Sequence, residues 1–459
     1  MSPANKLERL TQNLAQIDAA STARVRLAKL FDEGTFVEID AFAKAMGDGD
    51  TVVSGYGTVD GSTVFAFAQD RAASSGAVDK VHADKIKKIY ALATKTGAPV
   101  VGIYDSNGAS LASPAETMAA YGELLALSNN ISGVVPQVSV VLGPCVGSAA
   151  LIAMGADFVV MSGKAELTLT PPAQGSAQTA AETGVAHILA NDEEGAIASA
   201  RKIISLLPAN NLAQAPVWDY AEAAGAGDVL AAAGEDISKS TIAAVAGSIA
   251  DDASIVELQA EFGKGAYAAL ATIGGQVVGI SAAFGALASD ECAKLARLVS
   301  ICDAFSIPVV TLVHTAGFEA SANGARDAAR LAHVYAEATT PKVSLVVGEA
   351  YGSAYIALAG KGANADVAYA WPGAVISPLK PETAVAFLYS DRITAEKNRE
   401  AVESEYKDNE ASPFAYAQCG QLDAVIDPAK TRATLLSALD MLASKRVSTL
   451  PKKHSNILL

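Results

Sequence analysis

The sequence has few cysteines, and they are widely spaced. The four are Cys145, Cys292, Cys302 and Cys419, and no two of them form a C-x-x-C pair. This spacing excludes a dense disulfide framework and a cysteine-based zinc site. The histidines are also isolated in sequence, so no metal is expected. We therefore expect a protein that works in a reducing cytoplasm.

Positive charge is scarce as well. Lys and Arg number 34 against 49 Asp and Glu, which gives a net charge of -15, and no run of Lys or Arg is longer than a pair. Nonspecific nucleic-acid binding and adhesion to anionic membranes are therefore disfavoured. The first 16 residues lack the apolar core of a signal peptide, so we expect no export.

Charged residues are missing altogether from Leu124–Ala156, a stretch long enough to span a bilayer. However, Asn129, Pro136, Gly143 and Gly147 interrupt it. These residues indicate the end of a helix, a turn, a strand and a glycine loop before a new helix. We therefore do not predict a membrane span.

The sequence is long and rich in apolar residues. Of its 459 residues, 51% are hydrophobic and only 18% are charged, which predicts a folded protein of two or more domains. The mean hydropathy of +0.27 also favours association, because a single chain has more apolar surface than it readily hides.

The chain repeats itself. Gly97–Val101 is echoed by Ser306–Val310, and after a slip of four residues Pro136–Gly143 is echoed by Pro341–Gly348. The repeat predicts a duplicated domain, with residues 1–220 as the first copy and 221–459 as the second. Further pairs are Lys85 and Lys294, Pro99 and Pro308, and Gly108 and Gly317 at one offset, and Gly147-Ser148-Ala149 and Gly352-Ser353-Ala354 at the other.

Each copy has the same order of expected elements. Short apolar runs alternate with segments of helical periodicity, as in a parallel sheet covered by helices, so the predicted class is α/β. The expected strands are residues 63–68, 100–104 and 138–142 in the first copy and 277–283, 309–313 and 343–347 in the second, and the expected helices are 81–96 and 292–305.

A glycine turn follows the last of these strands in each copy, at Gly147 and Gly352. The first N–H groups of a helix have no partner within it and carry the positive end of its dipole. A Gly-Ser-Ala turn there can therefore donate hydrogen bonds to a developing oxyanion. Alternatively, the two glycines serve only tight turns or close helix packing.

Many segments match a known family, in the family's order. Over nearly its whole length the chain resembles the carboxyltransferase subunits of biotin-dependent acyl-CoA carboxylases, transcarboxylases and decarboxylases. The resemblance implies two tandem crotonase-like domains of the ClpP/enoyl-CoA hydratase superfamily, which agrees with the repeat. The matching segments are residues 31–38, 53–59, 95–100, 302–308, 335–339, 351–355, 370–372 and 451–457.

The resemblance implies transfer of CO₂ between N1′ of carboxybiotin and the α-carbon of an acyl-CoA thioester. Gly147 and Ser148 would hold the thioester oxygen, and Ser353 and Ala354 the ureido oxygen of biotin. No side-chain base is needed in that mechanism. The residues implied to border the biotin site are Tyr351, Gly352 and Tyr355. Arg326 and Arg330 open an expected helix, where they are candidates for contacts with CoA phosphates or biotin; a plain solvated helix face is the alternative.

The same resemblance implies partners. The chain has no Ala-Met-Lys-Met biotinylation sequence and no glycine-rich ATP-grasp pattern. We therefore expect biotin on a separate carrier protein, with a biotin carboxylase or a membrane decarboxylase subunit as a further partner. A homodimer would be the smallest active unit, with a hexamer as the expected full assembly.

Two other functions stay open at this point. One is a crotonase-type CoA hydratase, isomerase or hydrolase that works without biotin, and the other is an inactive assembly subunit. Several departures from the family pattern support the second: the second glycine of each turn is Ser148 or Ser353, and Ser110 stands where an arginine is usual. Neither serine lies in G-x-S-x-G, so a hydrolase nucleophile is disfavoured. His187 is expected to be structural.

Overall fold

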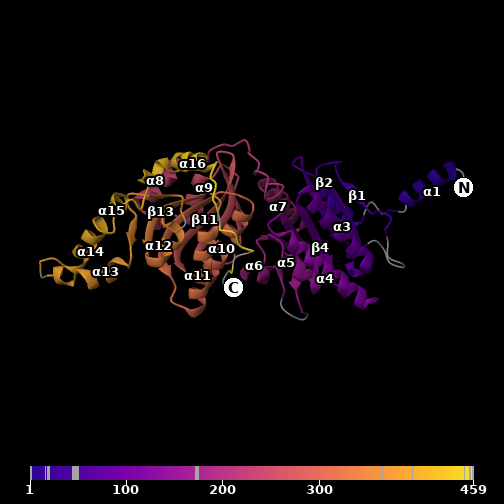
Figure 1. Cartoon of the computed structure of the whole chain (residues 1–459), viewed down its shortest axis with the longest axis horizontal. Coiled ribbons are helices and arrows are strands. Elements are labelled where there is room, and N and C mark those ends of the chain that lie inside the picture. The colour runs from indigo at the N-terminus through magenta and orange to yellow at the C-terminus, as the bar shows by residue number, and fades with distance from the viewer. Residues whose placement is uncertain are drawn as a thin grey trace. The chain divides into compact units, whose positions relative to one another are not determined.

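Figure 1 shows the computed structural model, in which helices cover the strands of two sheets. It divides into two compact units, Met1–Ala213 and Gln214–Leu459. The structure describes residues 3–15, 17, 21–43, 51–170, 175–363, 365–394, 396–448, 450–453 and 456. Part of the matching tail segment 451–457 lies outside these residues.

The first unit has an eight-stranded sheet and seven helices within the described residues. Its strands are β1 Val37–Ile39, β2 Val52–Val59, β3 Ser62–Gln69, β4 Val100–Ser106, β5 Gln137–Val146, β6 Phe158–Ser162, β7 Glu166–Thr168 and β8 Ile188–Ala190. Its helices are α1 Pro3–Ala15, α2 Thr22–Leu30, α3 Lys80–Thr96, α4 Pro114–Asn130, α5 Ser148–Met154, α6 Ala177–Glu182 and α7 Glu193–Leu206.

The second unit also has an eight-stranded sheet. Its strands are β9 Val256–Leu258, β10 Ala266–Ile273, β11 Gln276–Leu287, β12 Val309–Phe318, β13 Lys342–Tyr351, β14 Val367–Ala370, β15 Val375–Ser377 and β16 Ala424–Val425. Its helices are α8 Ala226–Glu235, α9 Ile242–Ile249, α10 Ser289–Ala304, α11 Ala322–Glu337, α12 Gly352–Ala359, α13 Pro381–Leu388, α14 Arg399–Asp408, α15 Pro413–Gln418 and α16 Thr431–Leu442.

The two sheets have the same plan. The first runs β1-β2-β3-β4-β5-β6-β8 with β7 beside β5, and the second runs β9-β10-β11-β12-β13-β14-β16 with β15 beside β13. All the expected strands and helices are present, and the predicted α/β class and internal duplication are confirmed. The expected strands pair in parallel, β3 with β4 and β4 with β5 in the first sheet, and β11 with β12 and β12 with β13 in the second. Each sheet is nevertheless mixed, because β2 pairs with β3, and β10 with β11, in antiparallel hairpins.

Two-residue turns explain these hairpins. Asp60 and Gly61 join β2 to β3 with φ of 48° and 78°, and Gly274 and Gly275 join β10 to β11 with φ of 62° and 78°. Positive φ at both central residues is typical of the tight turn whose twist matches that of a hairpin. Asp-Gly and Gly-Gly between apolar runs were therefore the signal that the parallel interpretation overlooked.

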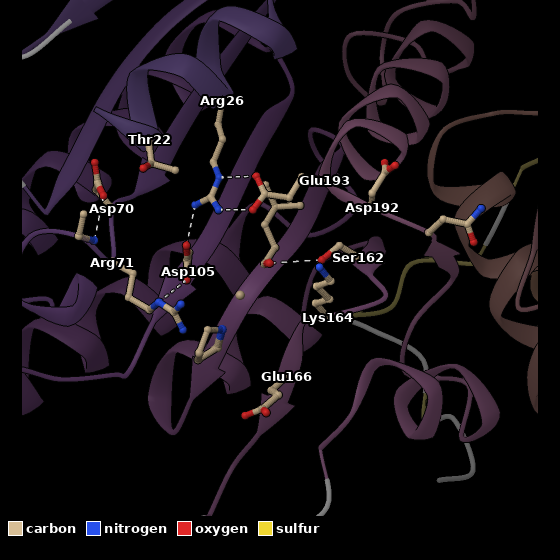
Figure 2. Close-up of a pocket in the computed structure, with 15 residues that line it drawn as sticks. Thr22, Arg26, Asp70, Arg71, Asp105, Ser162, Lys164, Glu166, Asp192 and Glu193 are labelled. Carbon is tan, nitrogen blue, oxygen red and sulfur yellow. Dashed lines mark hydrogen bonds and ion pairs between the residues drawn. The ribbon is translucent and has the colours of Figure 1, made fainter. Parts of the chain in front are cut away.

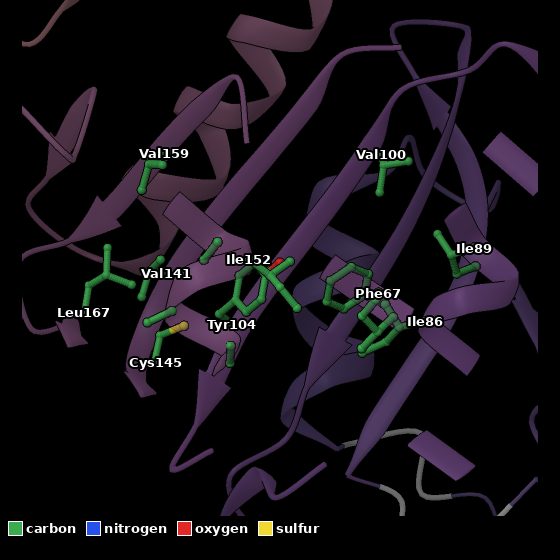
Figure 3. Close-up of a cluster of buried hydrophobic side chains, with 14 of the residues drawn as sticks. Phe67, Ile86, Ile89, Val100, Tyr104, Val141, Cys145, Ile152, Val159 and Leu167 are labelled. Carbon is green, nitrogen blue, oxygen red and sulfur yellow. The ribbon is translucent and has the colours of Figure 1, made fainter. Parts of the chain in front are cut away.

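The core of the first unit includes the side chains that α3, α4 and α5 bury against the sheet (Figure 3). The ring of Phe67 on β3 meets that of Tyr104 on β4 edge to face, with centroids 5.5 Å apart. A Cβ on Gly102 would lie 2.7 Å from Phe67, so the strand needs glycine to admit this ring. Such an aromatic pair contributes about 0.5 to 1.5 kcal/mol beyond its buried area.

Helix α3 shows how local sequence sets the ends of the elements. Asp79 accepts a hydrogen bond from the N–H of His82 at 2.9 Å and so caps the first turn. Gly97 ends the helix in the left-handed conformation, with φ of 67°.

Across the residues that the structure describes, no helix combines the length and apolar character that crossing a membrane requires.

Candidate active site

The first-unit turn lies where β5 passes into α5. Gly147 has φ of 66° and ψ of -129°, a backbone conformation that favours glycine. Its own N–H donates to the carbonyl oxygen of Thr168 on β7 at 2.9 Å. Ser148 is the first residue of α5, so its N–H has no partner within the helix. Of the two predicted donors at this turn, Ser148 is therefore the one whose N–H is left for a ligand.

The second-unit turn has the corresponding place. β13 ends at Tyr351, and α12 begins at Gly352, which has φ of 55°. Ser353 is exposed, whereas the side chain of Ala354 is fully buried. The N–H groups of Gly352, Ser353 and Ala354 belong to the first turn of α12, where no carbonyl of the same helix can accept them.

A second pair of glycines has matching backbone geometry in the two units. Gly108 follows β4 with φ of 109°, and Gly317 lies near the end of β12 with φ of 108°. The N–H of Gly108 donates to Oγ of Ser106 at 3.0 Å, and that of Gly317 to Oγ1 of Thr315 at 3.1 Å. A Cβ on Gly108 would lie 3.3 Å from the carbonyl oxygen of Val146, which directly precedes the first turn. The repeat in sequence is therefore also a repeat in backbone geometry.

A cavity of about 620 Å³ opens beside the first sheet, close to β5 (Figure 2). Its lining includes Arg26, whose side chain is 5% exposed and whose guanidinium binds Asp105 at 2.8 Å and Glu193 at 2.6 Å. Burial alone would lower the pKa of Arg26, but the hydrogen bonds with Glu193 and Asp105 raise it. Arg71 approaches the other oxygen of Asp105 at 3.6 Å.

The sequence analysis missed this charged cluster. Its members are far apart in the chain, and pairing at such distances leaves no local pattern. Asp105 gave the one signal, since it comes almost at the end of the buried strand β4. The carboxyl ends of parallel strands are where α/β proteins bind ligands.

Comparison with known proteins decides the family. The family model described as "Carboxyl transferase domain" matches residues 18–457. The chain belongs to the carboxyl transferase family. This confirms the predicted resemblance, and it favours a carboxyltransferase over a biotin-independent crotonase-type enzyme.

Individual relatives agree. The chain is 35% identical to the methylmalonyl-CoA decarboxylase subunit alpha of Veillonella parvula, over 98% of each chain. It is 36% identical to the propionyl-CoA carboxylase beta chain of Saccharopolyspora erythraea, over 95% of this chain and 90% of that one. Among solved structures, a transcarboxylase 12S hexamer with methylmalonyl-CoA and methylmalonic acid bound has a TM-score of 0.92 at 30% identity, with all of both chains covered.

The tyrosines of this carboxyl transferase flank the second turn. Tyr351 is buried, and its hydroxyl bonds to the carboxylate of Glu349; burial and this contact raise its pKa. Tyr355 packs edge to face against Tyr416, with centroids 5.7 Å apart. Its buried hydroxyl has no hydrogen-bond partner among the described residues.

The predicted arginines lie on α11, and both bind one buried carboxylate. Arg326 and Arg330 reach Asp327 at 3.4 and 3.0 Å, and Asp327 is 2% exposed. Burial alone would raise the pKa of Asp327, but contacts with Ser289 and the two arginines lower it. Both guanidiniums therefore act as counter-charges to this one carboxylate.

Other polar residues named from the sequence have structural contacts. His187 is buried, and its Nδ1 accepts the N–H of Val159 at 3.1 Å. Lys85 and Lys294 are both buried, and each Nζ donates to a main-chain carbonyl, at 2.9 and 3.0 Å. The repeat of these lysines therefore reflects a shared structural contact.

Proposed function

We propose that the chain moves a carboxyl group between biotin, held on a separate carrier protein, and the α-carbon of a short acyl-CoA thioester. The observation that carries this proposal is the paired turn: each of the two units presents, at the start of a helix, N–H groups that have no acceptor within that helix, and the reaction has two oxygens that gain negative charge. The relatives include a methylmalonyl-CoA decarboxylase, a propionyl-CoA carboxylase and a transcarboxylase with methylmalonyl-CoA bound, which indicates methylmalonyl-CoA and propionyl-CoA as the substrate class.

The first turn would hold the thioester. The N–H of Ser148 points out of the first turn of α5, at the positive end of the helix dipole. A donor fixed in this way stabilises the oxygen more as charge develops on it than in the ground state, which lowers the barrier to forming the enolate. Gly147 sets the backbone conformation that directs this donor.

The second turn would hold biotin. When bound, biotin carries the carboxyl group and its ureido oxygen gains charge when that group leaves. Ser353 and Ala354 would donate to this oxygen from the first turn of α12. Gly352 lets the backbone adopt the turn, and Tyr351 and Tyr355 would border the same site.

Arg326 and Arg330 would attract anionic groups and would not touch the reacting atoms. Arg326 is half exposed on α11 and keeps its guanidinium at the surface, although it contacts Asp327. Arg330 is held more closely by the same carboxylate. Both would offer positive charge to anionic groups of the biotin carrier or of CoA.

No nucleophilic side chain is needed. The cysteine nearest the first turn, Cys145, is fully buried, and burial raises the pKa of its thiol. A neutral buried thiol is a poor nucleophile. The backbone donors therefore remain the groups best placed for the chemistry.

The proposed partners follow from the family. We keep a biotinyl carrier protein as the direct partner, and either a biotin carboxylase or a membrane decarboxylase as the further one. We also propose a homodimer as the smallest active unit and a hexamer as the full assembly, since the structural relative is described as a hexamer. The cytoplasmic location stays a prediction.

Free biotin tests the proposal. The purified chain is incubated with methylmalonyl-CoA with and without free biotin, and propionyl-CoA is measured by chromatography. The expected result is that biotin accelerates product formation in a saturable way. Turnover that is equal with and without biotin would favour the biotin-independent alternative, and no turnover with any carboxylated acyl-CoA would favour the inactive subunit.

A further inference from the structure

His314 lies on β12, and its imidazole packs against β13 just before the second turn. Its Nδ1 accepts the N–H of Glu349 at 3.0 Å. A Cβ on Gly348 would lie only 2.3 Å from this Nδ1, so the imidazole occupies the space that a side chain there would need. The hydrogen bond therefore fixes β13 two residues before Tyr351, where the turn begins.

The direction of this hydrogen bond settles the protonation state that it needs. Because Nδ1 accepts from a backbone N–H, it carries no proton, and the neutral ring has its proton on Nε2. Protonation of Nδ1 would replace the bond by a contact between two donors. The bond thus exists only with the neutral imidazole.

Side chains of two neighbouring strands act on the ring of His314. From β11, the side chain of Phe284 meets it edge to face, with centroids 4.8 Å apart. From β13, the carboxylate of Glu349 is the charged group that acts on it, and this carboxylate also bonds to the hydroxyl of Tyr351. Burial lowers the pKa of His314 below its ordinary value, and Glu349 opposes this shift in part.

The first unit has a carboxylate in place of the imidazole at the matching position. Asp105 occupies the position that matches His314, and a Cβ on Gly143 would lie 2.0 Å from its Oδ1. The residue after Gly143 is Pro144, which has no N–H to satisfy. Asp105 is held by Arg26 instead. The two units therefore differ in the side chain that contacts the strand just before the turn: His314 in the second unit and Asp105 in the first.

We propose that His314 is a positioning residue for the Gly352 turn: its neutral imidazole holds β13 through the N–H of Glu349, and protonation releases this hold. The inference rests on the proposed function only in so far as the turn serves the biotin half of the reaction. It makes that half sensitive to protonation of an imidazole, a group that the corresponding position of the first unit lacks.

The pH dependence follows from the sign of the shift. Above the lowered pKa of His314 the imidazole is neutral and the turn is held. As the pH falls through that value, the bond to Glu349 is lost and turnover decreases. Because burial moves this pKa below 6.5, the loss is expected below that pH and not at neutral pH.

Two variants test the role. In His314→Asn, the side-chain oxygen can take the place of Nδ1 as an acceptor that does not titrate, whereas His314→Leu fills similar space without an acceptor. With methylmalonyl-CoA and free biotin, we expect the leucine variant to lose about tenfold in kcat, as for a buried N–H left unsatisfied, with little change in KM for the acyl-CoA. We expect the asparagine variant to recover most of kcat and to lack the acid limb of the pH profile.

Two measurements do not need activity. Nitrogen-detected NMR of the ring should show the proton of His314 on Nε2 at neutral pH, and hydrogen exchange of the Glu349 amide should become faster as the ring is protonated. A ring protonated on Nδ1 at neutral pH, or an asparagine variant with the acid limb of wild type, would overturn the inference. Absence of turnover in the wild-type protein would count against the proposed function instead.

Discussion

Arg201 and Arg432 make the same contact in the two units: each guanidinium binds the aspartate that holds the hairpin of its own sheet. Arg201 reaches Asp32 at 2.8 Å, and Arg432 reaches Asp251 at 2.5 Å. Asp32 accepts the N–H groups of residues 60 and 61, and Asp251 those of residues 274 and 275. The two pairs differ in burial, since the side chain of Asp32 is 27% exposed and that of Asp251 only 2%.

This difference predicts unequal losses of stability. Asp251→Asn leaves the buried guanidinium of Arg432 with only the exposed Glu222, 3.5 Å away, as a counter-charge, and should lower the free energy of unfolding by about 3 to 5 kcal/mol. Asp32→Asn, as the matched control, should cost about 1 to 2 kcal/mol, because water reaches that pair. Denaturant unfolding of both variants measures the losses. Equal losses would contradict the assignment of a buried and an exposed pair.

The same aspartate predicts an acid dependence. Burial alone would raise the pKa of Asp251, but contacts with Thr272, Gly275 and Arg432 lower it below 3.8. A carboxylate with a lowered pKa stabilises the fold above the pKa of the unfolded chain and loses this contribution as the pH falls. Unfolding measured from pH 5 downward should therefore show a steeper fall for wild type than for Asp251→Asn. Parallel curves would show that Asp251 does not titrate as expected.

The first turn predicts a sharp contrast between two substitutions of Ser148. Proline is tolerated at the first position of a helix but removes the N–H. Ser148→Pro should therefore lower kcat by roughly 100- to 1000-fold, as when one oxyanion donor is lost. Ser148→Ala keeps the N–H and removes the hydroxyl, so it should stay close to wild type. If alanine is as damaging as proline, the hydroxyl is the working group and the assignment of the N–H is wrong.

The carrier prediction concerns covalent biotin. The sequence has no Ala-Met-Lys-Met site, so the purified chain should give no signal on a streptavidin blot. A carrier protein expressed with its biotin ligase serves as the positive control on the same blot. A strong signal from this chain would show that it carries its own biotin.

Much of the architecture could be predicted from the sequence, for a physical reason. Apolar runs such as Val138–Leu142 are both the signal and the cause of buried strands. The duplication could be predicted because matching segments of the two copies keep a constant spacing along the chain. The antiparallel hairpins were overlooked although Asp60 and Gly61 indicated one of them.

The site was only partly predictable. The turns at Gly147 and Gly352 stood out because glycine and helix starts are local signals. The contacts of Arg26 with Asp105 and Glu193, and of His314 with Glu349, join segments far apart in the chain. Such pairing depends on sheet register and helix placement, which no short pattern contains.

The most direct test of the account mixes two damaged chains. Ser148→Pro removes the proposed thioester donor, and Ala354→Pro removes a proposed biotin donor in the first turn of α12. Each chain carries a different tag, both are co-expressed, and oligomers containing both are purified and checked by thermal melting. Turnover of methylmalonyl-CoA with free biotin is then measured for each single variant and for the mixture.

We propose that within the homodimer the first unit of one chain works with the second unit of the other. Mixed oligomers then contain some sites with both turns intact. The account predicts that each variant alone is nearly inactive and that the mixture regains a substantial fraction of wild-type turnover. Folded mixed oligomers that stay as inactive as the single variants would contradict a site shared between two chains, and full activity of either single variant would contradict the two-turn mechanism itself.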